Sequence, residues 1–363
     1  MASEDTDNAR LAEPPRDPVD DSALTRDELA RTATLVAKAT WALGLPRWFW
    51  GEGVCLTGLV QAGQEFDAGI PIEVVEWYDR QIATHPLRNL DHVNEVAPGA
   101  AAVDVVAGAG RTDYLPLLRA LADWTEGPDQ PRAANGALEH WPGGVWADTM
   151  YMVGRFLLRL GVQTGARELV IAGADQVVAH AEILQAGNGF FVHGAHRGEV
   201  VPCYWGRANA WAALALVEVL EAAAEAGGLP QEEAAEAALR RQLWALAAAQ
   251  PDHGVWDVLV DGNVETRGIL ETSAAAGIAG AMLRAAPLLR EPAFDEAGWR
   301  ALRGVLAYLD DGTLTRVSAG TVLQLVPFGY SVIRDDRPQL WGQGLVLTAL
   351  AAAGAAGRRA GLS

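Results

Sequence analysis

Apolar residues divide the chain into two kinds of helical segment that alternate along it. In six segments, apolar residues recur at spacings of three and four while charged residues occupy the opposite face. This spacing predicts amphipathic helices that turn one side to water. The segments are residues 22–43, 72–85, 113–125, 168–185, 231–250 and 294–309.

The other six segments consist mainly of small and apolar residues on every side of the predicted helix. Three of them open on a Trp-Gly dipeptide, and the remaining three show the same small-residue composition. A helix of this kind must be enclosed by other elements. The segments begin at Trp50, Trp205 and Trp341, and the remaining three span residues 91–108, 148–161 and 270–286.

Six enclosed helices that alternate with six half-exposed ones predict an all-α fold, an (α/α)6 barrel with an inner and an outer ring. An α-solenoid of helix pairs and a toroid of seven pairs are the alternatives. The count of six favours a closed barrel. One catalytic domain over residues 22–363 would contain all twelve helices, preceded by a disordered acidic segment over residues 1–21.

Long connections rich in Gly, Pro, Trp and His lead into four of the enclosed helices. Connections of this length within one domain usually serve function. Because all four enter inner helices, we expect them to gather at one mouth of the barrel. They span residues 127–146, 186–205, 251–268 and 311–341. Residues 189–193 and 255–260 alternate like strands and predict small hairpins at the rim.

Charge and composition exclude several classes of function. A formal net charge of −18 and a single lysine, Lys38, disfavour nucleic acid and anionic membranes as partners. Cys55 and Cys203 lie far apart and predict buried, reduced thiols. The N-terminus lacks the basic start and apolar core of a secretory signal, so we expect a cytoplasmic protein. Nothing resembles a phosphate loop, a dinucleotide motif, a zinc site or a serine-hydrolase elbow, so we expect no cofactor and no metal.

Two carboxylates occupy positions suited to chemistry. Asp148 stands where a Trp-bearing loop becomes an enclosed helix, and Asp91 stands at the start of another. Each has a structural interpretation as a helix N-cap. Alternatively, apolar walls could raise the pKa of Asp148 and let it act as a general acid. A pair of carboxylates across one cavity is the arrangement that glycoside-cleaving enzymes use.

Aromatic and basic residues follow in the same connections. His193 lies in a Gly-rich aromatic run, and Arg207 lies between Trp205 and Trp211 at the start of an enclosed helix. An arginine there could bind a carboxylate with its fork while an indole packs on a sugar face. The alternatives are a packed histidine and a structural ion pair. His140 adds a further polar group to the same mouth.

A series of motifs, in order along nearly the whole chain, resembles glycoside hydrolase family 105, the unsaturated rhamnogalacturonyl hydrolases, and more distantly family 88, the unsaturated glucuronyl hydrolases. Each motif alone is short, but their number and order make the resemblance specific. The motifs are Trp50-Gly51-Glu52-Gly53, Leu90-Asp91-His92-Val93-Asn94, Glu139-His140-Trp141, Trp146-Ala147-Asp148-Thr149-Met150-Tyr151-Met152, His193-Gly194, Trp205-Gly206-Arg207, Leu270-Glu271-Thr272-Ser273-Ala274 and Val317-Ser318.

The resemblance implies the (α/α)6 barrel and a particular hydrolysis. A terminal 4,5-unsaturated uronic acid would be removed from a lyase-generated oligosaccharide by hydration of its C4=C5 enol ether. Asp148 would protonate C4, water would add at C5, and the resulting hemiketal would open and release the next sugar. Asp91 would orient the sugar and assist Asp148. The resemblance also assigns substrate contacts to His193, Trp205, Arg207, Trp211 and His140.

The chain departs from the family pattern after Arg207. The family's usual Gly-Asn-Gly-Trp is here Ala208-Asn209-Ala210-Trp211, and two added methyl groups could narrow the pocket. The glycan, its linkage and the choice between monomer and homodimer stay open. A non-catalytic sugar-binding toroid and a sugar epimerase or isomerase on a similar barrel are the alternative functions.

Overall fold

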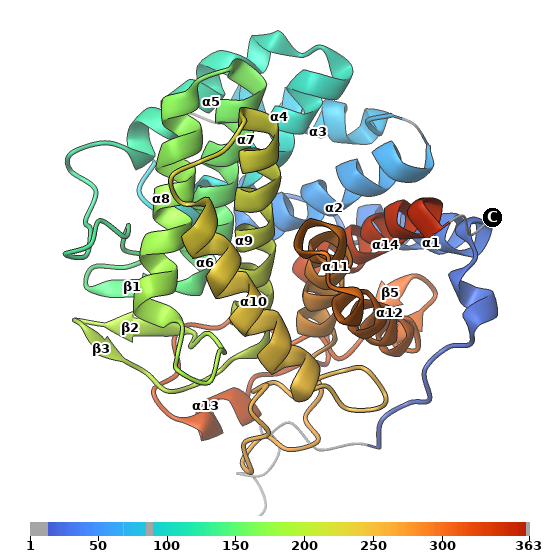
Figure 1. Cartoon of the computed structure of the whole chain (residues 1–363). Coiled ribbons are helices and arrows are strands. Elements are labelled where there is room, and N and C mark those ends of the chain that lie inside the picture. Colours follow the sequence, from blue (N-terminus) through green and yellow to red (C-terminus); the bar gives the residue numbers. More distant parts are fainter. Residues whose placement is uncertain (1–13, 68, 85–89, 361–363) are drawn as a thin grey trace, which may run out of the picture.

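Inner and outer helices alternate along the chain, as the apolar pattern predicts (Figure 1). The computed structural model describes residues 14–67, 69–84 and 90–360. The outer helices are α1 (Arg26–Leu43), α3 (Ile72–Thr84), α5 (Leu115–Thr125), α8 (Arg167–Leu184), α10 (Glu232–Ala248) and α12 (Pro292–Leu306). The inner helices are α2 (Trp50–Phe66), α4 (Ala97–Ala109), α6 (Ala147–Thr149) continuing into α7 (Arg155–Thr164), α9 (Gly206–Ala226), α11 (Thr272–Leu289) and α14 (Leu340–Ala360).

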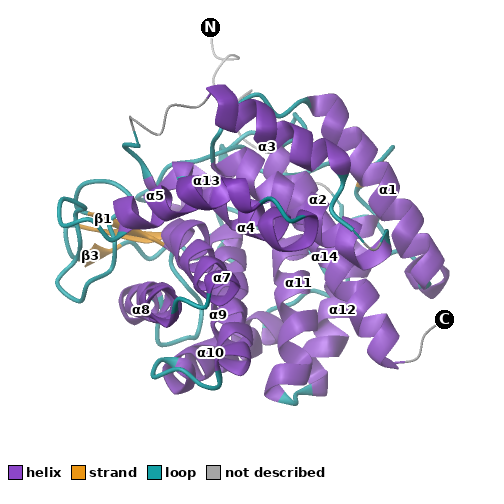
Figure 2. Cartoon of the chain, turned by 90° about the horizontal axis from the view of Figure 1, so that it is seen from above, coloured by secondary structure: helices purple, strands orange, loops and turns teal. Residues whose placement is uncertain are grey.

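The inner helices form a closed ring. Each packs against the next, from α2 through α4, α7, α9 and α11 to α14, and α14 packs back against α2. Small residues make this last contact possible. A Cβ on Gly58 would lie 2.2 Å from the carbonyl oxygen of Gly344, and one on Gly344 would lie 2.3 Å from that of Val54. The view from above shows α14 beside α2 (Figure 2). Closure confirms the barrel and excludes the open solenoid.

Two inner helices are long and apolar, but these properties alone do not make a helix a membrane span. Within the described residues, α11 and α14 are long and apolar enough to cross a membrane, but 83% and 78% of the respective windows are buried inside the protein. Their composition follows from their place in the inner ring, where other helices rather than lipid cover every side.

Short strands lie at one end of the barrel, but not where the alternation predicts them. A three-stranded antiparallel sheet joins β1 (Gly144–Trp146), β2 (Gly194–His196) and β3 (Glu199–Val200), and β4 (Leu309–Asp310) pairs with β5 (Thr313–Leu314). The predicted hairpins at residues 189–193 and 255–260 are wrong. Both stretches form isolated bridges instead. The backbone of Phe191, for example, exchanges hydrogen bonds with the side-chain amide of Asn209.

Part of the N-terminal segment that the sequence predicts to be disordered packs against the barrel. Residues 1–13 lie outside the described residues. The part that follows is held against α12 and the turn after it, because Val19 donates to the carbonyl of Arg303 at 3.2 Å and the backbone N–H of Arg16 donates to the hydroxyl of Tyr308 at 2.9 Å. The prediction of disorder is therefore wrong from about residue 14 onward.

Candidate active site

The long connections that lead into the inner helices meet at one end of the barrel, which we call the mouth. Pairing of β1 with β2 joins the second connection to the first. Gly206 donates to the carbonyl of Val258 at 2.8 Å, and Thr272 donates to that of Arg316 at 3.3 Å. These bonds link neighbouring connections to each other, so the predicted gathering at one mouth is confirmed.

Asp148 lies in the first turn of α6 at this mouth. The N-cap position belongs to Trp146, and no side-chain cap bond is found there. The N-cap interpretation of Asp148 is therefore wrong. A π-helical turn, Met150–Gly154, follows directly and connects α6 to α7. Turns of this kind often occur at functional sites, because the extra residue changes the direction of the side chains beside it.

His193 is the nearest ionisable neighbour of Asp148. It is fully buried in the connection that precedes β2, and its Nε2 lies 3.4 Å from Oδ2 of Asp148. Its backbone N–H donates to the carbonyl of Cys203, and its own carbonyl accepts from Ala147. These bonds fix the histidine between two connections, with its ring next to the carboxylate.

The electrostatic environment of Asp148 differs from the sequence-based expectation. Burial raises the pKa of the Asp148 carboxyl, but the nearby His193, His140 and Arg207 outweigh that effect, so the pKa lies below its ordinary value of 3.8. The expectation of a raised pKa is wrong for the protein by itself, because three basic groups converge on the apolar wall. Asp148 is consequently ionised at neutral pH.

Aromatic and basic side chains form a nearly continuous ring around the mouth. Neighbouring members lie with ring centroids, or a guanidinium carbon and a ring centroid, between 4.3 and 6.5 Å apart. Such a ring offers flat faces on which a sugar can pack. In spatial order the members are Trp50, Trp341, Arg207, Trp205, His193, Trp146, His140, His92 and Phe49.

Arg207 is fully buried within this ring, and its guanidinium is already engaged. It donates to the carbonyl and hydroxyl of Ser318 at 2.9 and 2.7 Å and to the carbonyl of Ala319 at 2.9 Å. It also lies 3.6 Å from the buried carboxylate of Glu271. The geometry thus supports the structural ion pair, which was the alternative to direct binding of a substrate carboxylate.

Asp91 is exposed and does not begin an inner helix. Helix α4 begins six residues later, at Ala97, after a short 3-10 turn over Val93–Glu95. The cap of that turn is His92, whose Nδ1 accepts from Asn94, while Glu95 accepts from the backbone of Asp91 at 3.0 Å. The N-cap interpretation of Asp91 is wrong. Its pairing with Asp148 across one cavity stays a prediction.

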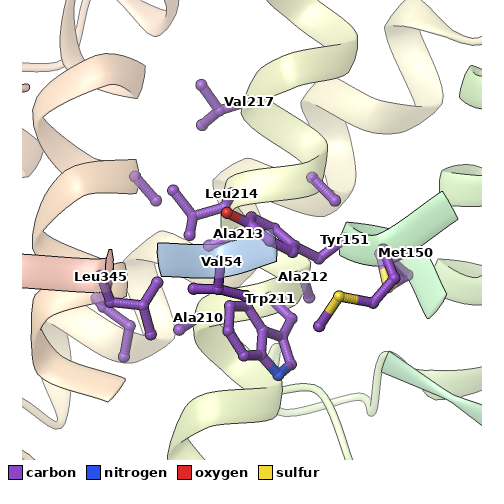
Figure 3. Packing of buried hydrophobic residues seen from close by; sticks show 14 of the residues in the cluster. Val54, Met150, Tyr151, Ala210, Trp211, Ala212, Ala213, Leu214, Val217 and Leu345 are labelled. Carbon is purple, nitrogen blue, oxygen red and sulfur yellow. The ribbon is translucent and has the colours of Figure 1, made fainter. Parts of the chain in front are cut away.

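His140 and Trp211 each contact a residue that follows Asp148 closely in the chain. His140 is buried, its Nδ1 is 3.1 Å from the hydroxyl of Thr149, and burial lowers its pKa to about 3. Trp211 packs 4.7 Å from Tyr151 in the interior of the inner ring (Figure 3). Its neighbour Ala210 fills the space beside Gly277, where an added Cβ would lie 2.7 Å from the Ala210 methyl. The methyl of Ala210 therefore tightens a contact between α9 and α11.

Several buried polar atoms at the mouth have no hydrogen-bond partner among the described residues. Buried polar groups are nearly always paired in folded proteins, so these atoms are available to pair with water or with a polar ligand. The set mixes donors and acceptors, which suits the hydroxyl groups of a sugar. The atoms are Oδ2 of Asp148 and Nε2 of His193, which face each other at 3.4 Å, together with Nε2 of His92 and Nε1 of Trp205. Nε1 of Trp211, deeper in the inner ring, is a further such atom.

Tyr330 is a residue of the site that sequence reasoning missed. It lies in α13 (Pro327–Ser331), and its hydroxyl oxygen is 2.6 Å from Nδ1 of His193. The two residues are 137 positions apart, and no local pattern around Tyr330 signals the contact. Within the described residues no group of three or more His, Cys, Asp or Glu side chains could hold a metal ion.

Comparison with known proteins places these features in a family. Residues 25–354 match the family model described as Glycosyl Hydrolase Family 88. The chain is 30% identical over 320 residues to the unsaturated rhamnogalacturonyl hydrolase YesR of Bacillus subtilis (strain 168), a match that covers 84% of this chain and 89% of YesR.

Solved structures share the fold. A possible member of family GH105 from Salmonella enterica superposes with a TM-score of 0.81 at 23% identity, covering 95% of this chain and 99% of that one. A second possible member of that family, from Klebsiella pneumoniae, gives 0.78 at 24% identity and covers 98% and 99%. The unsaturated glucuronyl hydrolase of Bacillus sp. GL1 gives 0.68 at 17% identity and covers 89% and 95%. At these identities the likeness shows a common fold.

Proposed function

The chain belongs to the unsaturated uronyl hydrolases of glycoside hydrolase families 88 and 105, and on that premise we propose that its substrate is of the rhamnogalacturonan type. As a member of this family it is a glycoside hydrolase that releases a terminal 4,5-unsaturated uronic acid by hydrating the enol ether. The rhamnogalacturonan assignment rests first on its relative YesR, which carries that activity in its name.

An exposed apolar stretch of the rim supports the same assignment. Val322, Leu325, Val326 and Phe328 are each more than half exposed, in the segment that also carries Tyr330. Rhamnose is a 6-deoxy sugar and presents a methyl group where other hexoses carry a hydroxyl. Contact between that methyl group and the apolar rim would remove both from water, at a gain of about 25 cal/mol for each Å² buried.

The observation that carries the catalytic part of the proposal is the contact between Asp148 and His193 inside the aromatic ring. Asp148 gives its proton to C4 of the uronate, and water adds at C5. The hemiketal then opens and frees the neighbouring sugar, while the proton of the water returns to the carboxylate. One residue can act as acid and then as base in such a hydration.

Substrate binding itself would prepare Asp148 to act as an acid. The protein holds the pKa of Asp148 low through His193, His140 and Arg207. A uronate carboxylate that enters the mouth adds a negative charge among these basic groups and so raises the pKa of Asp148. On this proposal the neutral methyl ester of the same substrate is hydrated more slowly, even where it binds.

We also propose where the protein acts and what it binds. We place it in the cytoplasm, where buried free thiols such as Cys55 and Cys203 stay reduced. Its partner is a short oligosaccharide with an unsaturated uronate end, bound by a monomer or by each copy in a homodimer.

A panel of lyase-generated oligosaccharides tests the function directly. The ultraviolet absorbance of the conjugated enol ether should disappear when the protein meets a fragment of rhamnogalacturonan, and the Asp148→Asn variant is the matched control. Turnover of glucuronyl fragments alone would refute the rhamnogalacturonan assignment. If the absorbance persists with every fragment while free sugars interconvert, the isomerase alternative holds instead.

A further inference from the structure

We propose that Tyr330 is a positioning residue, whose hydroxyl sets which ring nitrogen of His193 carries a proton and therefore what His193 presents to Asp148. The proposal rests on the proposed function of the Asp148 site. It assigns a role to a residue that belongs to the rim rather than to any inner helix.

The contact is short and enclosed. The hydroxyl oxygen of Tyr330 lies 2.6 Å from Nδ1 of His193, and both side chains are fully buried. The tyrosine ring packs near the histidine ring at 5.9 Å and near Trp205 at 6.1 Å. A hydrogen bond of this length in a water-excluded place restricts both rings to one orientation.

The direction of this hydrogen bond follows from the neighbours of the tyrosine oxygen. The backbone N–H of Gln324 donates to that oxygen at 3.4 Å, so the oxygen is already an acceptor. Burial holds the pKa of Tyr330 well above its ordinary value of 10, so the phenol keeps its own proton. The arrangement that pairs this buried proton is donation from Tyr330 to Nδ1 of His193.

A histidine that accepts at Nδ1 carries its proton on Nε2 when the ring is neutral. Nε2 is the nitrogen that lies 3.4 Å from Oδ2 of Asp148. His193 therefore turns an N–H toward the carboxylate, which stabilises Asp148 once it has given up its proton. Without the tyrosine hydroxyl the ring can adopt the other tautomer, and a lone pair on Nε2 would then face the carboxylate.

The rim segment that carries Tyr330 is fixed to the barrel at its base. Arg207 donates to the carbonyl of Ala319, and Ala319 in turn donates to the carbonyl of Arg334 at 2.8 Å. The two ends of the segment are thus tied together, and α13 is held between them. This gives buried Arg207 a part in the site without direct contact with substrate.

The matched variants are Tyr330→Phe and Tyr78→Phe. Both remove one hydroxyl from a buried tyrosine, since the hydroxyl of Tyr78 donates to the carbonyl of Pro98, also at 2.6 Å. Tyr78 lies in outer helix α3, and its loss tests what removal of any such bond does to the fold. We expect kcat to fall about 10- to 100-fold in Tyr330→Phe, with KM changed less than about twofold, and we expect kinetics near wild type in Tyr78→Phe.

Nitrogen NMR of the imidazole rings gives a readout that needs no substrate. The chain has seven histidines, and the signals of His193 are identified by their loss in His193→Gln. We expect a protonated Nε2 and an unprotonated Nδ1 in the wild-type protein, and a mixture of tautomers in Tyr330→Phe.

A wild-type spectrum with the proton on Nδ1, or an unchanged tautomer in Tyr330→Phe, would overturn the proposal. Equal losses of activity in the two tyrosine variants would do the same. A protein that hydrates none of the oligosaccharides but shows the expected tautomers would instead refute the proposed function, so the two failures can be told apart.

Discussion

The mouth of the barrel and the interior of its inner ring differ in how their buried acidic groups are paired. At the mouth, Asp148 has one ion-pair contact among the described residues, at 3.4 Å from Nε2 of His193, and its Oδ2 has no hydrogen-bond partner among them. In the C-terminal halves of the inner helices, Glu218 accepts hydrogen bonds from Arg155, Arg159 and Arg284 at 2.8 to 3.1 Å.

These residues form an ionic cluster that joins four inner helices. Its members are Asp104 of α4, Arg155 and Arg159 of α7, Glu218 and Glu221 of α9, and Arg284 of α11. Each charge in the cluster has an opposite charge beside it, so removal of one member would leave its partner uncompensated. At the mouth, Arg207 is paired with Ser318 and Ala319, whereas Asp148 and His193 keep atoms without a hydrogen-bond partner among the described residues. The residues that join the inner helices through ion pairs are therefore different from those proposed to bind the substrate.

Replacing the carboxylate at the mouth should have the largest effect on activity and little on the fold. In Asp148→Asn we expect kcat to fall at least about 1,000-fold, a loss of roughly 4 kcal/mol, because the amide can give no proton to C4. The melting temperature should stay near the wild-type value, since Asp148 caps no helix. Steady-state hydration rates and thermal denaturation measure the two effects.

A matched control is Asp257→Asn. Asp257 is another rim carboxylate, and it accepts from the backbone of Gly268 at 3.0 Å. We expect nearly wild-type rates from this variant. Wild-type turnover by Asp148→Asn would mean that the mouth carboxylate is structural, and the contrast between the two regions would disappear.

Replacing the central carboxylate of the ionic cluster should give the reverse result. Glu218→Gln leaves buried Arg155 and the partly buried Arg159 and Arg284 short of a negative charge, so we expect the free energy of unfolding to fall by roughly 3–5 kcal/mol. The kcat of the folded fraction should remain near wild type. Urea denaturation gives the first quantity, and assays well below the melting temperature give the second.

Glu221→Gln is the matched control, from which we expect a smaller loss of stability. The Glu221 side chain is 33% exposed and pairs with Arg284 alone among the described residues. We expect it to cost about 1 kcal/mol or less. Equal losses of unfolding free energy in the two glutamine variants would show that Glu218 is not the central residue of the cluster.

The close contact between α9 and α11 can be tested with a pair of glycines in α11. A Cβ on Gly277 would lie 2.7 Å from that of Ala210, whereas one on Gly280 meets its nearest neighbours at 3.5 Å, an ordinary contact. We expect Gly277→Ala to cost about 1–3 kcal/mol of unfolding free energy. Gly280→Ala should instead stabilise by about 0.5–1 kcal/mol, as alanine does in a helix interior.

A second change shows whether Ala210 is the cause. Ala210→Gly in the Gly277→Ala background should recover part of the loss in the same denaturation experiment. If it recovers nothing, the methyl of Ala210 does not limit the approach of α9 to α11.

Lowering the pH should reduce the free energy of unfolding through the buried histidines first and through Glu218 at lower pH. We expect these effects to be smaller than those of the substitutions above. Burial lowers the pKa of His140 to about 3 and that of His180 to about 4. Below the ordinary histidine pKa of 6.5 the unfolded chain therefore binds protons that the folded protein does not, and stability falls as the pH falls. The pKa of Glu218 lies well below 4.5, because its arginines outweigh burial, so its contribution is lost only as the pH falls below 4.5.

Melting temperatures across the acid range separate these contributions. The double variant His140→Asn, His180→Asn should flatten the decline by a few degrees from about pH 6.5 down to the folded-state pKa values of about 4 and about 3. A decline between pH 6.5 and 4.5 that is the same in the variant would show that other groups cause it.

Much of the fold could be read from local patterns. The amphipathic segments 72–85 and 168–185 became α3 and α8 within one residue at each end. The periodicity succeeds because the side of a helix that faces the core is decided by residues three and four apart. The ordered motifs also located Asp148 and His193, which lie 3.4 Å apart.

The sequence by itself thus determined the helices, their two kinds and their order, since those depend on neighbours along the chain. Tertiary structure alone decided the closure of α14 on α2, the pairing of Arg207 with Ser318, the low pKa of Asp148 and the contact of Tyr330 with His193. Each of these joins residues that are distant in the chain, and no periodicity within a segment can encode which distant group will lie beside it. The charge of Asp148 and the proton on His193 therefore depend on how the connections pack.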